Sequence, residues 1–187
     1  MTLIIAAVDE KGSYIGSDSM GSNGYTGELY KNKKIFALGD EILAGGCGSF
    51  KELQLLEKDF SVPRRFADQS DSEYMYNTFA HALKKFFAEH NVLSNDNGVV
   101  ENNKGEFLFI YRGTIYKWQS DLSLLETTRS FDATGSGEVY AHAVMSTLDS
   151  EKSKLTAEQR IKKAIKLTSQ YVLSVGGEPS VIKIKEK

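Results

Sequence analysis

The sequence contains little cysteine, little net charge and no long run of apolar residues. Its single cysteine, Cys47, excludes an internal disulfide and is consistent with a reducing compartment. A formal net charge of −2 gives no electrostatic basis for binding nucleic acid or an anionic membrane. No apolar stretch approaches the length of a membrane span, and the N-terminus lacks the basic segment of a secretory signal. We therefore expect a cytoplasmic protein with neither nucleic-acid nor membrane partners.

Signals of several specialised classes are also missing. Histidines, cysteines and carboxylates show no metal-ligand spacing, and no glycine loop fits a P-loop or a full dinucleotide fingerprint. We therefore expect neither a metal nor a cofactor. No repeat or linker divides the 187 residues, of which 41% are hydrophobic, so the sequence predicts a single domain over residues 1–187.

Hydrophobic periodicity predicts the order strands, helices, strands, helices and a last strand. The expected strands cover 2–8, 13–18, 33–38, 41–45, 106–112, 115–118, 131–134 and 180–185. Helices are expected over 49–60 and 72–90, after the 135–137 turn in a segment that carries Val139, Ala143 and Leu148, and over 157–172 behind a Thr156–Gln159 capping box. Polar segments 20–27 and 91–104 read as loops. Strand 2–8 is apolar on both faces, which favours two sheets between two helix layers.

Thr2 follows the initiator methionine and leads directly into the first expected strand. Initiator methionine is usually removed before a small residue, and removal here would give threonine a free α-amine beside its hydroxyl. Such a residue carries a nucleophile and its base together, and the amine has a pKa of roughly 7.7–8.0. The alternative interpretation is a start codon followed by a strand.

Asp18 and Lys34 form a second candidate pair. Asp18 ends the second strand, and strict alternation places Lys34 on the same face as Phe36 and Leu38. A lysine on an apolar face is costly unless it is paired, and an aspartate is its natural partner. A structural ion pair and a solvated charge run over residues 31–34 remain the alternatives.

Glycine-rich turns at residues 44–49 and 134–137 each lead from an expected strand into an expected helix. Backbone N–H groups at such a junction can bind a phosphate or a developing oxyanion, although tight turns are the simpler explanation of both segments. Cys47 is better explained as a small buried side chain than as a nucleophile, because no histidine lies near it in the chain. The three histidines, His81, His90 and His142, fall in expected helices.

Together these residues resemble the proteasome β-subunit family of N-terminal nucleophile (Ntn) hydrolases, and above all its bacterial proteasome-like subunit that works with an ATP-driven unfoldase. Asp18 and Lys34 stand 16 and 32 residues after Thr2, the family's intervals. Four stretches carry the likeness: 2–7, 16–18, 32–35 with 42–48, and 134–141. The resemblance implies an α+β fold, namely a four-layer αββα sandwich of two antiparallel sheets between helix layers.

The resemblance also implies roles for individual residues. Thr2 Oγ would attack a peptide carbonyl, and its amine together with Lys34 would transfer the proton. Asp18 would hold Lys34, Ser136 would bond near the Thr2 amine, and the Gly48 N–H would face the oxyanion. The chain would then be a threonine endopeptidase once Met1 is removed. It would act on peptides or unfolded proteins inside a homo-oligomeric ring, with an ATP-dependent unfoldase as a possible partner.

Two departures from the family pattern keep other functions open. The position four residues before Gly176 often holds an aspartate in active subunits, but here it is Val172, with Tyr171 and Ser174 nearby. The glycine loop is also one residue shorter, counted from Lys34, than in the bacterial proteasome-like subunit. The assignment of Gly48 as the oxyanion donor depends on this interval. The alternatives are an inactive assembly or interaction subunit and an Ntn amidase that acts on a small molecule.

Overall fold

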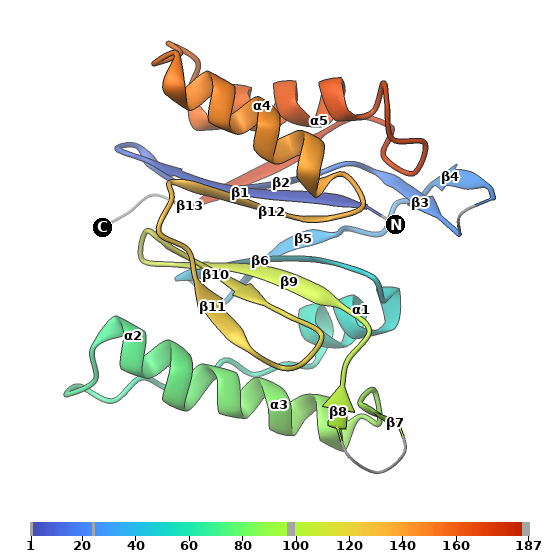
Figure 1. Cartoon of the computed structure of the whole chain (residues 1–187). Helices are drawn as coiled ribbons and strands as arrows, with labels where there is room; N and C mark the ends of the chain where they lie inside the picture. Colours follow the sequence, from blue (N-terminus) through green and yellow to red (C-terminus); the bar gives the residue numbers. More distant parts are fainter. Residues whose placement is uncertain (1, 24, 97–99, 185–187) are drawn as a thin grey trace.

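The computed structural model describes residues 2–23, 25–96 and 100–184, and they form four layers (Figure 1). The first sheet has the order β12-β1-β2-β13, from Phe131–Gly135, Leu3–Asp9, Gly12–Ser17 and Ser180–Ile184. The second has the order β11-β10-β9-β6-β5, from Leu124–Glu126, Thr114–Trp118, Glu106–Tyr111, Ile42–Cys47 and Ile35–Leu38. All neighbouring strands are antiparallel.

Helices cover the outer face of each sheet. The first sheet is covered by α4 (Glu138–Ser150) and α5 (Ala157–Thr168). The second is covered by α1 (Phe50–Lys58) and by a continuous run of α2 (Asp71–Glu73), the π-helical turn η1 (Tyr74–Phe79) and α3 (Ala80–Glu89). The predicted αββα sandwich of two antiparallel sheets is therefore confirmed.

Strand β1 explains why the first expected strand is apolar on both faces. Leu3, Ile5 and Ala7 pack beneath α4 and α5, whereas Ile4 and Ala6 point into the core between the two sheets. All five side chains are fully buried. A strand in this position has no solvent face, so its sequence shows no polar alternation.

Both segments expected to be loops contain short paired strands, so that expectation was wrong for their described parts. In segment 20–27, β3 (Met20–Ser22) pairs with β4 (Gly27–Leu29), while residue 24 lies outside the described residues. In segment 91–104, β7 (Ser94–Asp96) pairs with β8 (Val100–Asn102), while residues 97–99 lie outside them. Strands of three residues are too short to show a period, and β11, which has the same length, was not predicted for the same reason.

The helix predicted after the 135–137 turn is present as α4, and it carries Val139, Ala143 and Leu148. Its buried side chains are Ala141, Met145 and Leu148, whereas Val139 is 73% exposed and Ala143 is exposed. In α5 the Thr156–Gln159 capping box is present as predicted. The helix ends at Thr168, so Val172 lies beyond it.

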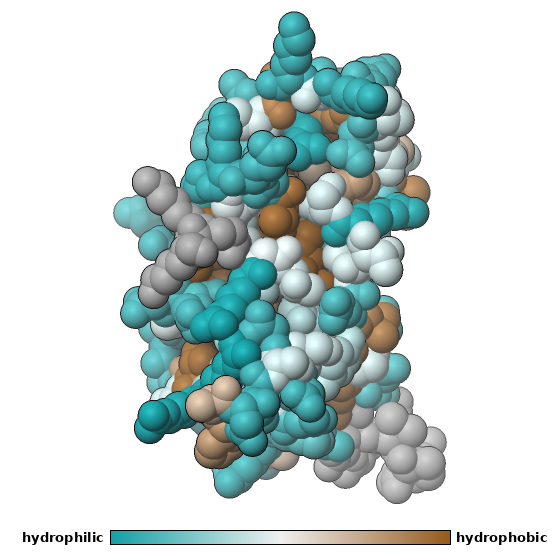
Figure 2. All heavy atoms as spheres, turned by 90° about the vertical axis from the view of Figure 1, so that its left-hand side faces the viewer, coloured by the Kyte–Doolittle hydropathy of each residue, from teal (hydrophilic) through white to brown (hydrophobic). Residues whose placement is uncertain are grey.

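No helix among the described residues has both the length and the apolar character needed to cross a membrane. Figure 2 shows the end of the molecule away from the start of β1, where hydrophilic spheres predominate. Hydrophobic spheres reach this surface mainly near mid-height, at the level of the two sheets.

Candidate active site

Thr2 immediately precedes β1 and is buried. The strand lies between β12 and β2, with Leu3 opposite Gly135 and Ile4 opposite Ser17. This register brings Thr2 to the turn that follows β12 and to Asp18, which follows β2. The Met1–Thr2 peptide bond lies partly outside the described residues.

Asp18 is the centre of the hydrogen-bond network beside Thr2. Its Oδ1 accepts the Leu3 N–H at 3.0 Å and the Lys34 Nζ at 2.7 Å. Its Oδ2 accepts the N–H groups of Met20 at 3.2 Å and Gly176 at 3.1 Å. Asp18 is only 1% exposed, and the four donors pair both of its buried oxygens. One oxygen thus joins the Lys34 ammonium to the first peptide group of β1.

Lys34 crosses from the second sheet to the first to reach Asp18. It is 3% exposed, and its Nζ also donates to the Met20 carbonyl at 2.6 Å. Burial lowers the pKa of Lys34 from its ordinary value, and the Asp18 carboxylate opposes this shift. The amine therefore loses its proton more readily than a lysine in water.

The predicted partnership of Lys34 with Asp18 is confirmed, but the face predicted for Lys34 was wrong. Phe36 and Leu38 pack in the outer core beneath α1 and α3, on the other side of their sheet from Asp18. Because β5 begins only at Ile35, strand alternation does not extend back to Lys34.

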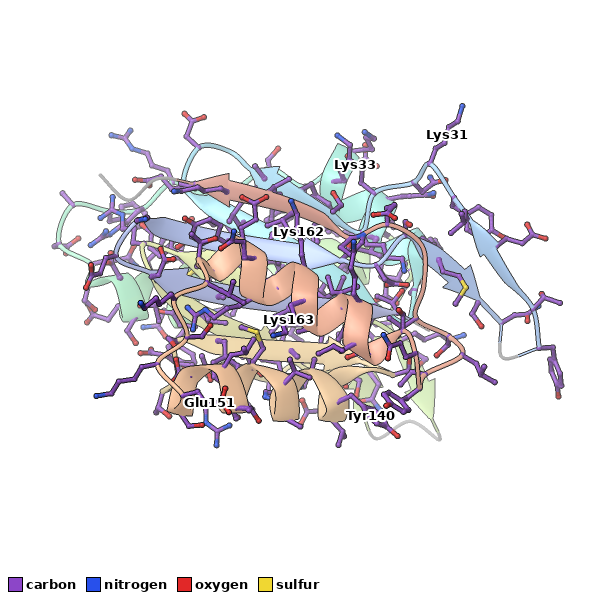
Figure 3. The ribbon with its side chains drawn as sticks, turned by 90° about the horizontal axis from the view of Figure 1, so that it is seen from above. Lys31, Lys33, Tyr140, Glu151, Lys162 and Lys163 are labelled. Carbon is purple, nitrogen blue, oxygen red and sulfur yellow. The ribbon has the colours of Figure 1, made fainter. Side chains whose placement is uncertain are left out.

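The solvated charge run expected as an alternative over residues 31–34 is present only in part. Figure 3 shows Lys31 and Lys33 extending outward from the chain before β5, and both are exposed. Lys34, one residue further on, is buried. The run therefore contains solvated lysines and one lysine that is held inside the site.

Ser136 lies in the turn after β12 and contacts Thr2 directly. Its Oγ donates to the Thr2 carbonyl at 3.2 Å and lies 2.8 Å from the Ser174 Oγ. Ser174 is buried and stands two residues after Val172, where the resemblance led us to look for an aspartate. A hydroxyl from the same segment thus contacts Ser136. The only sequence signal for Ser174 is a small polar residue just before Gly176.

Two glycines are required by their surroundings at this end of the sheets. Gly135 has a φ of 101°, and a Cβ there would overlap the Thr2 carbonyl oxygen. Gly48 has a φ of 91°, and a Cβ there would overlap the Lys104 carbonyl oxygen. Gly48 follows Cys47, whose Cβ would lie 3.5 Å from a Cβ on Gly135. The two glycine turns therefore lie close together, near Thr2.

Cys47 is a small buried side chain, as predicted. Its Sγ lies 3.7 Å from the Thr134 Oγ1, which in turn donates to the Glu106 carboxylate at 2.6 Å. Burial raises the pKa of the Cys47 thiol, so the thiolate that a nucleophilic cysteine needs is disfavoured.

A cavity of about 440 Å³ adjoins this network. Gly21 lies on its wall directly after Met20, whose carbonyl accepts from Lys34, and Asn32 lies two residues before Lys34. The rings of Tyr30 and Phe50 meet edge to face on the same wall, with centroids 6.1 Å apart. The lining of the cavity thus combines amides, hydroxyls, the Glu28 carboxylate and two aromatic rings.

Comparison with solved structures finds the same architecture over nearly the whole chain. Thiobacillus denitrificans BPH is 21% identical, with a TM-score of 0.76, over 100% of this chain and 99% of that one. The same protein in complex with epoxomicin is 19% identical, with a TM-score of 0.77, over 99% of each chain. Eukaryotic HslV from Trypanosoma brucei is 14% identical, with a TM-score of 0.69, over 98% of this chain and 99% of that one.

This chain has the HslV/proteasome Ntn-type fold. No protein-family model and no curated protein matches its sequence. In the Ntn-type fold seen here, the start of β1 lies at one end of the two sheets (Figure 1). Thr2, Asp18, Lys34, Ser136 and Gly48 all belong to segments that meet at that end.

Proposed function

We propose that this chain is a threonine-type endopeptidase subunit of the proteasome and HslV class, with Thr2 as its N-terminal nucleophile. The proposal is carried by one observation: the Lys34 ammonium and the Leu3 N–H both donate to the same oxygen, Asp18 Oδ1. This shared oxygen places a buried ammonium of lowered pKa beside Thr2, whose α-amine Met1 removal would set free. An ion pair that served only stability would not require this position.

In the proposed reaction, Thr2 Oγ attacks the peptide carbonyl carbon and its proton passes to the Thr2 amine, with Lys34 assisting through its charge and hydrogen bonds. The oxyanion is stabilised by the Gly48 N–H. The C–N bond then breaks, and the leaving amine takes the proton. Water, deprotonated by the same Thr2 amine, hydrolyses the ester and restores the hydroxyl. Ser136, supported by Ser174, holds the Thr2 main chain in position throughout.

We further propose that copies of this chain assemble into a ring that encloses the site, and that the assembly works in the cytoplasm. The full-length likeness to BPH and HslV supports assembly with copies of itself. Peptides and unfolded chains are the expected substrates, and an ATP-driven unfoldase is the expected partner of such a chamber.

The deciding experiment compares native protein with Thr2→Ala and Thr2→Ser in cleavage of small peptides. Alanine is also a small second residue, so Met1 removal continues and only the hydroxyl is lost. Thr2→Ala is expected to abolish cleavage, and Thr2→Ser is expected to retain part of it. A β-lactone should add covalently to Thr2 in the native protein, and epoxomicin is a second probe because BPH is described in complex with it.

Thr147→Ala is the matched control, because the Thr147 hydroxyl donates to the Ala143 carbonyl on the exposed side of α4. It should leave cleavage unchanged. Full activity in Thr2→Ala would refute the proposal. Inactivity of every form towards peptides would point to an assembly subunit, whereas activity confined to an acylated small molecule would point to an amidase.

The intact mass of protein from its own host tests the state of the N-terminus. The proposal requires a mass that lacks Met1. Quantitative retention of Met1 would block the amine and rule out the enzyme as proposed.

A further inference from the structure

Glu52 is a buried carboxylate for which the proposed reaction has no use. It lies in the first turn of α1 and is 1% exposed. Its Oε1 accepts the Lys104 N–H at 3.1 Å, and its Oε2 accepts the Gly105 N–H at 2.9 Å and the Asn103 Nδ2 at 2.9 Å. All three donors belong to the short segment that leads into β9.

A carboxylate at this depth is costly unless its oxygens are well paired. The three N–H groups supply that pairing. The same bonds hold the segment of residues 103–105 at a fixed position against α1. Asn103, itself 3% exposed, also donates to the Gly105 carbonyl at 2.6 Å. Glu52 and residues 103–105 are called the Glu52 clamp below.

The Glu52 clamp lies directly against Gly48. At the φ of 91° adopted by Gly48, a Cβ would overlap the Lys104 carbonyl and would lie 3.1 Å from the Gly105 Cα. The next residue, Ser49, caps α1 by accepting the Glu52 N–H at 3.3 Å. The Gly48 turn is thus bounded on one side by the cap of α1 and on the other by the segment that the Glu52 carboxylate holds.

We propose that Glu52 is a positioning residue, which sets the orientation of the Gly48 peptide through the Glu52 clamp. The inference rests on the proposed function, in which the Gly48 N–H stabilises the oxyanion. An oxyanion donor acts through its placement, and a displacement of about 1 Å can cost on the order of 10²-fold in rate. Glu52 would therefore affect turnover without touching substrate.

The test is Glu52→Gln in the native assembly. Glutamine keeps the shape but replaces one acceptor oxygen with an NH₂ group, so at least one donor of the clamp loses its partner. We expect kcat to fall about 10- to 100-fold while KM stays within about twofold, because the donor acts mainly in the transition state. Thr156→Ala is the control for an effect of lost stability alone. It removes the N-terminal cap of α5, which lies beside Asp9 at the end of β1 away from Thr2.

Asn103→Ala provides a milder variant in case Glu52→Gln fails to fold, because it removes one donor and leaves both backbone bonds. It should lower kcat in the same direction by a smaller factor. If the clamp variants lose no more kcat than Thr156→Ala at equal loss of thermal stability, the inference is overturned. The same holds if the loss falls on KM alone.

Hydrogen–deuterium exchange gives a readout that does not depend on catalysis. In either clamp variant, exchange should increase in peptides covering residues 47–50 and 103–107, and it should stay unchanged around residues 156–160. Unchanged exchange at 47–50 would overturn the inference. If native protein cleaves no peptide, the proposed function fails, and this exchange comparison still decides whether the clamp orders the Gly48 turn.

Discussion

Asp18 and Lys34 are both buried, but Lys34 has fewer other hydrogen-bond partners than Asp18 and therefore relies more on the ion pair. If Lys34 loses its charge, Asp18 still receives three backbone N–H groups, from Leu3, Met20 and Gly176. If Asp18 loses its charge, the one other acceptor for the Lys34 ammonium among the described residues is the Met20 carbonyl. A buried charge left without its partner is expensive, so the aspartate should matter more to stability than the lysine.

Asp18→Asn is therefore expected to lower the free energy of unfolding by about 3–5 kcal/mol, and Lys34→Met by less. Urea unfolding at neutral pH measures both. Without Asp18 the main effect that opposes burial is lost, so the pKa of Lys34 falls further. At higher pH, Lys34 is deprotonated in the folded variant but still protonated in the unfolded chain, so the free energy of unfolding rises with pH. The loss of stability caused by Asp18→Asn should therefore be smaller at higher pH.

Asp40→Asn, in the exposed turn between β5 and β6, should change stability by less than about 0.5 kcal/mol. A larger cost for Lys34→Met than for Asp18→Asn would contradict this account of the pair.

At the scale of elements, the end of β12 holds the start of β1 in place. Leu3 is paired with Gly135, and the turn that follows brings Ser136 to the Thr2 carbonyl. The backbone at Gly135 approaches Thr2 so closely that no side chain fits between them. This junction therefore transmits any displacement of β12 directly to Thr2.

Gly135→Ala tests this junction against Gly39→Ala. Both glycines have positive φ, 101° and 61°, but a Cβ on Gly39 meets nothing within 4 Å. Gly39→Ala should cost only the backbone strain, about 1–2 kcal/mol, and keep activity. Gly135→Ala should cost more and lower peptide cleavage by about 100-fold or more, because it displaces Thr2. Equal effects of the two substitutions on cleavage would refute the proposed role of this contact.

Elements with strong periodicity could be predicted from the sequence, and those held by distant contacts could not. The apolar strand at residues 2–8 and the α5 stripe of Ile161, Ile165 and Thr168 follow from local pattern. The short strand β3 depends on the Gly176 carbonyl, which accepts the Met20 N–H at 3.1 Å across a long stretch of chain. Such a contact leaves no mark in the local sequence.

The candidate site shows the same division. The Asp18–Lys34 partnership could be predicted, because a buried lysine needs a partner and the family spacing names one. The contact between Ser136 and Ser174 could not, because two serines 38 residues apart show no pattern. The Glu52 clamp was likewise missed, since a glutamate in the first turn of a helix ordinarily faces water.

At the scale of the whole molecule, an exposed apolar patch lies beside the candidate site. Its members follow Ser136 or precede Ser174 in the chain, and they are Val139, Tyr140, Tyr171 and Leu173. Leu173 is 98% exposed, and the rings of Tyr140 and Tyr171 stack with centroids 6.0 Å apart. Figure 3 shows Tyr140 at the end of α4 opposite Glu151. An apolar patch of this kind is typical of a surface that another chain covers.

Leu173→Asp is therefore expected to weaken assembly, because it would place a charge in a contact between copies. Native mass spectrometry should show a large assembly for unaltered protein and smaller species for the variant, with circular dichroism unchanged. Leu125→Asp is the matched control, since Leu125 is 48% exposed on β11 in the other sheet. An assembly of unaltered mass in Leu173→Asp would exclude this patch as a contact between copies.

The position of β1 between β12 and β2 has a consequence for the order of events during biosynthesis. Strand β12 covers Phe131–Gly135, so the nascent N-terminus emerges long before its flanking strand exists. At roughly 5–20 residues per second, that interval lasts on the order of ten seconds. Afterwards Thr2 is enclosed and a processing enzyme has little access to it. Under the proposed function, methionine excision would therefore be timed by translation, and a chain that misses the interval would fold with Thr2 still capped.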